Sequence, residues 1–97
     1  MIVIRVAVEV KPEEVGAFVN HLQQEMAGVK QFAGCERFHL YTDVQDTNKF
    51  LLYEEWATAE NFQAYRTSDF FEENSKKLHG MMAGEPDSAY FEASVVG

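Results

Sequence analysis

Residues 34–57 read GCERFHLYTDVQDTNKFLLYEEWA and contain two runs rich in aromatic and aliphatic side chains. The runs Gly34–Val44 and Lys49–Ala57 have the composition and alternation of β-strands that bury one face. Between them, the polar residues Gln45–Asn48 predict a turn. The sequence therefore predicts an antiparallel hairpin, on which the rest of the chain must pack.

A strand and a helix are predicted upstream of the hairpin. Ile2–Val10 is β-branched and presents an unbroken apolar face, as a strand does. Lys11–Glu14 then opens a helix, because proline suits the first turn and glutamates favour the positive end of the helix dipole. The helix ends before Gly34. Its apolar stripe consists of Val15, Phe18, Val19, Leu22, Met26 and Val29. His21 lies off this stripe and is predicted to be a surface residue.

Two further helices and a last strand are predicted downstream. Thr58 is a suitable N-cap for a helix over Ala59–Arg66. A break follows, and Ser68 caps a second helix that runs from Asp69 to about Leu78. The β-branched and aromatic stretch Ser88–Val96 predicts the last strand.

The resulting order, β-α-β-β-α-β, predicts an α+β fold with a ferredoxin-like antiparallel sheet and its helices on one face. The whole chain, residues 1–97, forms a single domain. The uncovered sheet face is expected to carry Tyr41, Tyr53 or Trp56, and Tyr90, which is more apolar than a solvated face should be. Packing against a second copy would bury it, so we expect a homodimer formed through the open sheet face.

Composition excludes several classes of function. The chain has 16 acidic and 8 basic residues, for a net charge of −8, and its Lys and Arg residues are mostly scattered singly. Without a basic stripe, neither nucleic acids nor anionic membranes are expected partners. A single cysteine excludes an internal disulfide, and no Cys/His cluster has metal-ligand spacing. No apolar run is long enough to span a membrane, so a cytoplasmic location is expected.

Several motifs resemble those of the antibiotic biosynthesis monooxygenase (ABM) family. They are Gly34-Cys35, Arg37-Phe38, Leu40-Tyr41, Asp43, Phe50, Leu52-Tyr53-Glu54 and Trp56 in the hairpin, Ser68-Asp69-Phe70-Phe71 at the helix break, and Met82-Ala83-Gly84-Glu85-Pro86 in the exit loop. The resemblance covers nearly the whole chain and implies a dimeric α/β-barrel.

What the resemblance implies about chemistry is broader. Members of the family include monooxygenases that oxidise quinols or aromatic polyketides without metal or flavin. Others degrade haem or process a phosphorylated signal. Haem-degrading relatives place a histidine in the last helix, where this chain has Asn74-Ser75-Lys76-Lys77 with His79 out of register. Signal-processing relatives place histidines where Tyr65 and Phe70 stand, so both of these activities are disfavoured.

The candidate catalytic residues are Asn74, Tyr65 and His39. Asn74 falls inside the apolar stripe of the last helix, so it either lines a cavity or caps a nearby backbone group. Tyr65 stands where relatives place a pocket-facing His or Trp, and it is either a hydrogen-bond donor to substrate or a core residue. His39 has the side chain of a general base, with an interfacial position as the alternative.

Candidate substrate-binding residues surround these positions. Arg66 could hold a developing anion or simply lie on the surface. The expected walls of an apolar slot are Trp56, Phe62, Phe71 and Met81. Two other residues are given structural roles. Glu54 is expected to pair with an arginine across the strands, with Arg5 or Arg37 as partner. Cys35, on the face that carries Arg37 and His39, is expected to be a small apolar filler.

The leading functional hypothesis is a monooxygenase that uses no metal or organic cofactor and oxidises a small quinol-like or polyketide-like aromatic with O₂. Such an enzyme needs an apolar slot, a group that takes a phenolic proton, and exclusion of water. One alternative is a non-catalytic small-molecule-binding or stress-response dimer. Another is an isomerase or lyase that acts on a small carbonyl compound with Tyr65 or His39 as the proton carrier.

Overall fold

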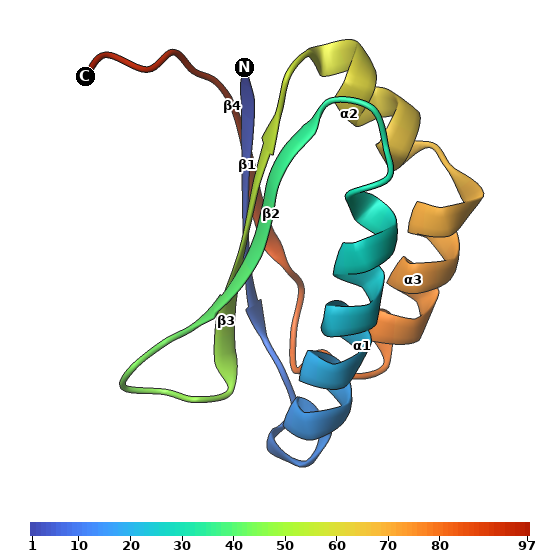
Figure 1. The fold of residues 1–97 in the computed structure, drawn as a ribbon. Coiled ribbons are helices and arrows are strands. Elements are labelled where there is room, and N and C mark those ends of the chain that lie inside the picture. Colours follow the sequence, from blue (N-terminus) through green and yellow to red (C-terminus); the bar gives the residue numbers. More distant parts are fainter.

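The computed structural model describes residues 1–97 and contains one four-stranded antiparallel sheet with the strand order β2-β3-β1-β4. The elements along the chain are β1 (Ile2–Glu9), a 3-10 turn η1 (Pro12–Glu14), α1 (Val15–Val29), β2 (Cys35–Thr42), β3 (Lys49–Trp56), α2 (Ala59–Arg66), α3 (Asp69–His79) and β4 (Asp87–Glu92). All three α-helices cover the same face of the sheet (Figure 1). The predicted ferredoxin-like α+β fold is confirmed, and the sheet of this single chain is open rather than a closed barrel.

The helix boundaries agree closely with the sequence signals. The Thr58 hydroxyl accepts a hydrogen bond from the Asn61 backbone N–H at 3.1 Å, which starts α2. The Ser68 hydroxyl accepts one from the Phe71 N–H at 3.2 Å, which starts α3. Each cap satisfies a backbone donor that the first helical turn leaves free. The last strand differs from the prediction, because it begins at Asp87 and ends at Glu92, and the chain beyond it is not a strand.

The start of β2 also differs from simple alternation. The pairing of β2 with β3 shifts register between Cys35 and Arg37, so Cys35 lies opposite Trp56 while Arg37 lies opposite Glu55. A bulge of this kind puts one extra residue into a strand and reverses the face of what precedes it. The prediction that Cys35 shares a face with Arg37 and His39 is therefore wrong, and Cys35 packs against the core beneath the helices.

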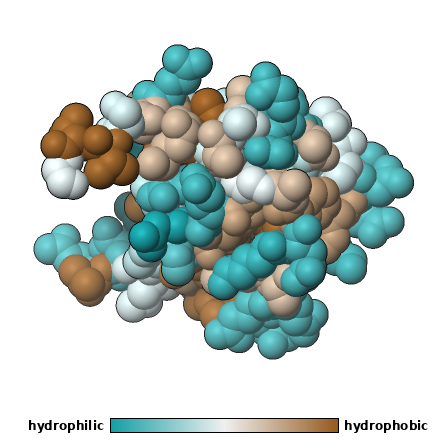
Figure 2. Space-filling view, turned by 45° about the horizontal axis from the view of Figure 1, so that its top comes forward, coloured by the Kyte–Doolittle hydropathy of each residue, from teal (hydrophilic) through white to brown (hydrophobic).

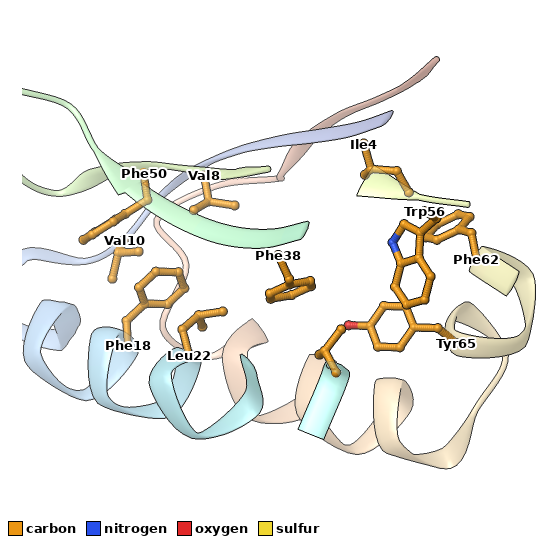
Figure 3. Close-up of a cluster of buried hydrophobic side chains, with 11 residues drawn as sticks. Ile4, Val8, Val10, Phe18, Leu22, Phe38, Phe50, Trp56, Phe62 and Tyr65 are labelled. Carbon is orange, nitrogen blue, oxygen red and sulfur yellow. The ribbon is translucent and has the colours of Figure 1, made fainter. Parts of the chain in front are cut away.

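The core lies between the sheet and the helices (Figure 3). Its fully buried members include Ile4 from β1, Leu22 from α1, and Phe38 and Trp56 from the hairpin. Aromatic rings are numerous, and Phe18 meets Phe50 with ring centroids 5.0 Å apart. Such rings bury large apolar areas, which is how a chain of 97 residues obtains a sizeable core.

The other sheet face is uncovered (Figure 1). Tyr41 is 53% exposed on it, and the Tyr53 hydroxyl donates to Glu55 at 2.5 Å. Of the predicted pair Tyr53 or Trp56, Tyr53 is the one on this face, and Trp56 is fully buried on the helix side. The prediction for Tyr90 is wrong, because it lies on the helix side and packs on the ring of Phe62 at 5.4 Å. Successive residues of a strand point to opposite faces of the sheet, and Trp56 and Tyr90 each stand at a position that points to the core.

Hydrophobic atoms also project from the body at the left of the molecule, on the arm that the C-terminal segment forms (Figure 2). Val95 and Val96 in this segment are 75% and 99% exposed. The segment is held at its base, where the backbone N–H of Ala93 donates to the carbonyl of Met1 at 2.9 Å. No helix in the chain combines the length and apolar character needed to cross a membrane.

Candidate functional site

A cavity of about 200 Å³ lies between the sheet and the helices. Most of its wall is apolar and comes from every layer of the fold. The lining residues from the strands are Ile4, Val6, Val8, Leu40, Leu52, Glu54, Ser88 and Tyr90. Those from the helices and the exit loop are Phe18, Leu22, Glu25, Phe62, Tyr65, Arg66, Phe71, Ser75, Leu78, Met82 and Pro86. Two carboxyl groups and two phenols, those of Tyr65 and Tyr90, therefore face a space that is otherwise mainly hydrocarbon.

Glu54 is the carboxyl that the sheet contributes. It lies on the core-facing side of β3 between Leu52 and Trp56, and it is only 4% exposed. The indole Nε1–H of Trp56 donates to its Oε1 at 2.9 Å. Burial raises the pKa of Glu54 to about 7, although this hydrogen bond from Trp56 lowers it in part. The prediction that Glu54 pairs with an arginine is wrong, because the neighbouring Glu55 makes that ion pair with Arg37 at 3.2 Å.

Glu25 is the second carboxyl and comes from α1. It is 7% exposed and follows Phe18 and Leu22 on the buried face of the helix. Burial raises its pKa to about 7, and a hydrogen bond from Tyr65 partly opposes that shift. The imidazole Nε2 of His21, one helical turn earlier, lies 3.5 Å from Glu25 Oε1. His21 is thus half-buried beside the site, and the prediction that it is a surface residue is wrong.

Tyr65 connects the carboxyl groups to the aromatic core. Its ring stacks on Trp56 with centroids 5.1 Å apart, and its hydroxyl lies 3.5 Å from Glu25 Oε2 (Figure 3 shows the two rings). Burial, followed by the nearby charges of Glu25 and Glu54, raises the pKa of the phenol. Tyr65 therefore stays protonated and serves as a donor in this site.

The cavity opens between α2 and α3. Arg66, Phe71 and Ser75 belong both to its wall and to a surface depression of about 460 Å³ on the outer side of these helices. The guanidinium of Arg66 lies over the Phe71 ring, 4.7 Å from its centroid. Arg66 is exposed and makes no ion pair with a carboxylate of this chain, so its charge is free at the mouth of the cavity.

The structure brings some of the residues predicted from the sequence together. Tyr65, Arg66, Phe62 and Phe71 all line the cavity. Trp56 does not line the cavity, but its indole N–H donates a hydrogen bond to Glu54, which does.

Three other candidates lie outside the cavity. The Asn74 side chain donates to the backbone carbonyl of Phe70 at 2.8 Å. It therefore caps a nearby backbone group, which is one of the two roles predicted for it, and does not line the cavity. His39 lies on the open sheet face opposite Tyr53. Met81 packs against the core, and its neighbour Met82 lines the cavity instead.

The two carboxyl groups are the functional candidates that the sequence reading missed. Glu25 lies three residues after Leu22 and four before Val29, inside the helical stripe. Glu54 alternates with Leu52 and Trp56 on the buried side of a strand. The signal that selected Asn74, a polar group on an apolar face, applies equally to both of these acids.

Comparison with known proteins agrees with this architecture. Residues 1–77 match the family model described as antibiotic biosynthesis monooxygenase. The chain belongs to the ABM family. The matched residues include the cavity carboxyls Glu25 and Glu54 and the phenol of Tyr65. No curated protein matches the ABM chain.

Solved structures share the fold at low sequence identity. A candidate ABM protein from Caulobacter crescentus CB15 is 21% identical, with a TM-score of 0.92 over 97% of this chain and 90% of its own. A candidate ABM protein from Nitrosomonas europaea is 20% identical, with a TM-score of 0.89 over 95% and 88%. A conserved protein from Methanosarcina mazei Go1 is 22% identical, with a TM-score of 0.91 over 96% and 92%. At these identities the likeness shows the fold, while the family match supports a general monooxygenase-like function.

Proposed function

We propose that this ABM protein is a cofactor-independent monooxygenase that oxidises a small quinol-like aromatic with O₂. The observation that carries the proposal is the pair of buried carboxyl groups on an apolar cavity. Glu25 and Glu54 each have a pKa of about 7, against an ordinary value of 4.5. A base whose pKa lies near the working pH is suited to taking a phenolic proton, and the surrounding hydrocarbon keeps water from the reactive intermediates.

The size of the cavity favours a single aromatic ring. Its volume is about 200 Å³. An apolar cavity of about 150 Å³ accommodates benzene, whereas sites for larger ligands start at roughly 300 Å³. A monocyclic phenol or hydroquinone is therefore the proposed substrate class in preference to a polycyclic polyketide.

The proposed reaction takes a phenol or hydroquinone and O₂ to a quinone and water, and it needs a hydrogen on a ring carbon ortho or para to the ionised hydroxyl. Removal of the phenolic proton gives a phenolate, which transfers one electron to O₂. The phenoxyl radical and superoxide then join at that ring carbon, and protonation gives a hydroperoxide. Loss of the hydrogen on this carbon and of hydroxide as water cleaves the O–O bond. One oxygen atom remains as the new carbonyl, and no electron from an external reductant is needed.

Four side chains have roles in this proposal. Glu25 takes the phenolic proton as general base, and the Tyr65 hydroxyl orients that carboxylate. Arg66, with its unpaired charge at the mouth, attracts the anionic form of the substrate. Glu54, which accepts a hydrogen bond from Trp56, is the second titratable group beside the aromatic ring of the proposed substrate.

We also propose that the protein works as a homodimer formed through the open sheet face. The alternating positions of this face carry apolar and aromatic side chains among charged ones. The face includes Val3, Arg5, Ala7, Arg37, His39, Tyr41, Leu51, Tyr53, Glu55, Ala89 and Phe91. A second copy packed sheet to sheet would remove this surface from water and leave both cavities under their own helices.

Oxygen uptake by the metal-stripped protein tests the enzymatic proposal, with monocyclic hydroquinones and phenols compared with anthrones. Glu25→Gln should lower kcat/KM by about 10²-fold or more, the range of general base catalysis, and Tyr65→Phe by a smaller factor. Lys77→Ala, an exposed change on α3, is the matched control and should retain activity. Mass spectrometry with ¹⁸O₂ should place one labelled atom in the product. Uptake at the autoxidation rate in every protein would reject the monooxygenase.

A proton-transfer enzyme acting on a small carbonyl compound is the second candidate. It is favoured by the same carboxyl pair together with the protonated phenol of Tyr65, which can move protons without O₂. Anaerobic incubation of small ketones in D₂O should then give deuterium exchange at carbon that Glu25→Gln abolishes. Ligand binding without oxygen uptake or exchange would indicate a binding protein.

A further inference from the structure

His21 and Glu25 form a pair that connects the cavity with the outside of α1. The two side chains stand four residues apart, on adjacent turns of the helix. Their facing atoms, Nε2 of His21 and Oε1 of Glu25, are both buried, and neither has a hydrogen-bond partner that meets normal geometry. At 3.5 Å the two atoms can exchange a proton after a small approach of the side chains.

The imidazole ring has an inner and an outer nitrogen. Nε2 is closed off from solvent, whereas the side chain as a whole keeps 16% of its exposure. Nδ1 makes no hydrogen bond within the chain and remains open to water. A histidine with one nitrogen on a buried carboxyl and the other toward solvent can accept a proton on one side and release it on the other.

The remaining groups around Glu25 do not provide such a path. From α2, the Tyr65 hydroxyl faces the other carboxylate oxygen, and Arg66 lies at the cavity mouth. From β3, Glu54 brings a second buried acid, and its hydrogen-bond donor is Trp56 rather than water. The titratable side chain that β4 adds is Tyr90, while β1 and α3 add none to the cavity wall. His21 is therefore the titratable contact of Glu25 that reaches solvent.

We propose that His21 is the proton relay of the site and carries protons between Glu25 and bulk solvent. This inference rests on the proposed function of Glu25 as the base. When Glu25 takes the phenolic proton and hands it to His21, the carboxylate is restored and the positive charge moves away from the phenolate. Return of the proton to the substrate then no longer competes with electron transfer to O₂. The proton that forms the hydroperoxide travels the same path inward, so the overall reaction neither gains nor loses protons.

Chemical rescue tests the relay. His21→Gln keeps similar bulk but cannot carry protons, and we expect kcat in a weakly buffered solution to fall by about tenfold or more. Added imidazole should restore the rate in proportion to its concentration. The control His79→Gln removes an exposed histidine at the end of α3 and should leave the rate unchanged with and without imidazole. A His21→Gln enzyme with full activity, or a loss that imidazole does not repair, would overturn the relay.

A measurement without substrate separates this inference from the proposed function. Carbon-13 NMR can follow the Glu25 carboxyl through a pH titration in wild type and in His21→Gln. Loss of the His21 nitrogen that faces the carboxylate should move the Glu25 midpoint upward, because a hydrogen-bonding partner stabilises the charged form of a carboxyl group. An unchanged midpoint would mean that the two groups do not share protons, whatever the oxygen assay shows. A shifted midpoint in a protein that consumes no oxygen would support the interaction of His21 with Glu25 and would reject the monooxygenase.

Discussion

The buried acids Glu25 and Glu54 bear on stability as well as chemistry. Each carboxyl has a pKa of about 7 in the folded chain and an ordinary value of 4.5. Between these values the folded state binds more protons than the unfolded state, so stability must fall as the pH rises through this window. Above pH 7 the cost is complete and amounts to at most about 3 kcal/mol for each carboxyl.

Replacing Glu54 with glutamine should therefore stabilise the protein on the alkaline side. The amide stays neutral, and its oxygen can still accept the hydrogen bond from Trp56. We expect Glu54→Gln to raise the free energy of unfolding by roughly 1–3 kcal/mol at pH 8 and by little at pH 4.5. Urea unfolding at the two pH values measures this difference. Glu55→Gln, on the opposite sheet face, is the control and should gain nothing at pH 8; equal effects of Glu54→Gln at both pH values would contradict the assignment.

These acids also mark where sequence reasoning stopped at the residue scale. The apolar periodicity is sufficient to predict which face of α1 is buried. It does not predict that Glu25, a charged residue on that same face, is buried with the apolar side chains. Burial of a carboxyl depends on what packs over it, here Tyr65 from a helix about forty residues later. Such long-range contacts leave no local pattern, although an acid at a core position does indicate a site.

Elements were more predictable than sites, because their signals are local. The caps at Thr58 and Ser68 and the turn after β2 each act within a few residues. The bulge at the start of β2 could not be read in this way. It directly follows Gly34, whose positive φ of 83° and close approach to Asn61 belong to the packing of the hairpin against α2.

The packing of α1 against α3 gives a test at the scale of elements. A methyl group added at Gly28 of α1 would lie 2.5 Å from Cζ of Phe70, so the Phe70 ring would have to move. That ring is held against Phe32, with centroids 5.7 Å apart. We expect Gly28→Ala to destabilise the protein by about 1–3 kcal/mol, as overpacking does, in spite of the better helix propensity of alanine. Thermal and urea unfolding measure the change.

Gly16 supplies the matched control, because it lies in the same helix and a methyl group there meets no atom within 4 Å. Gly16→Ala should stabilise the protein by about 0.5–1 kcal/mol through helix propensity alone. Opposite signs for the two substitutions would support the close approach of α1 and α3. If both variants were stabilised equally, the Phe70 ring would have to be free to move aside.

At the scale of the whole molecule, the two faces of the sheet have different surroundings. The helix side encloses the cavity within a single chain, and the other side has apolar and aromatic positions but no covering layer (Figure 1). Leu51 lies on the open face of the inner strand β3, paired with Ala7 on one side and Tyr41 on the other. If two copies pack through these faces, a charge at this position would be buried without a partner.

Leu51→Asp should therefore convert a dimer into a folded monomer, since the side chain faces away from the core and is only half-buried in the single chain. Sedimentation equilibrium would measure the mass, and circular dichroism would check the fold. Leu51→Asn separates charge from size and should weaken association less. Because all cavity residues come from one chain, a folded Leu51→Asp monomer should keep the ligand affinity of the wild type. A wild-type protein that is already monomeric would reject the dimer, and a monomer that loses ligand affinity would show that the partner supports the helices around the cavity.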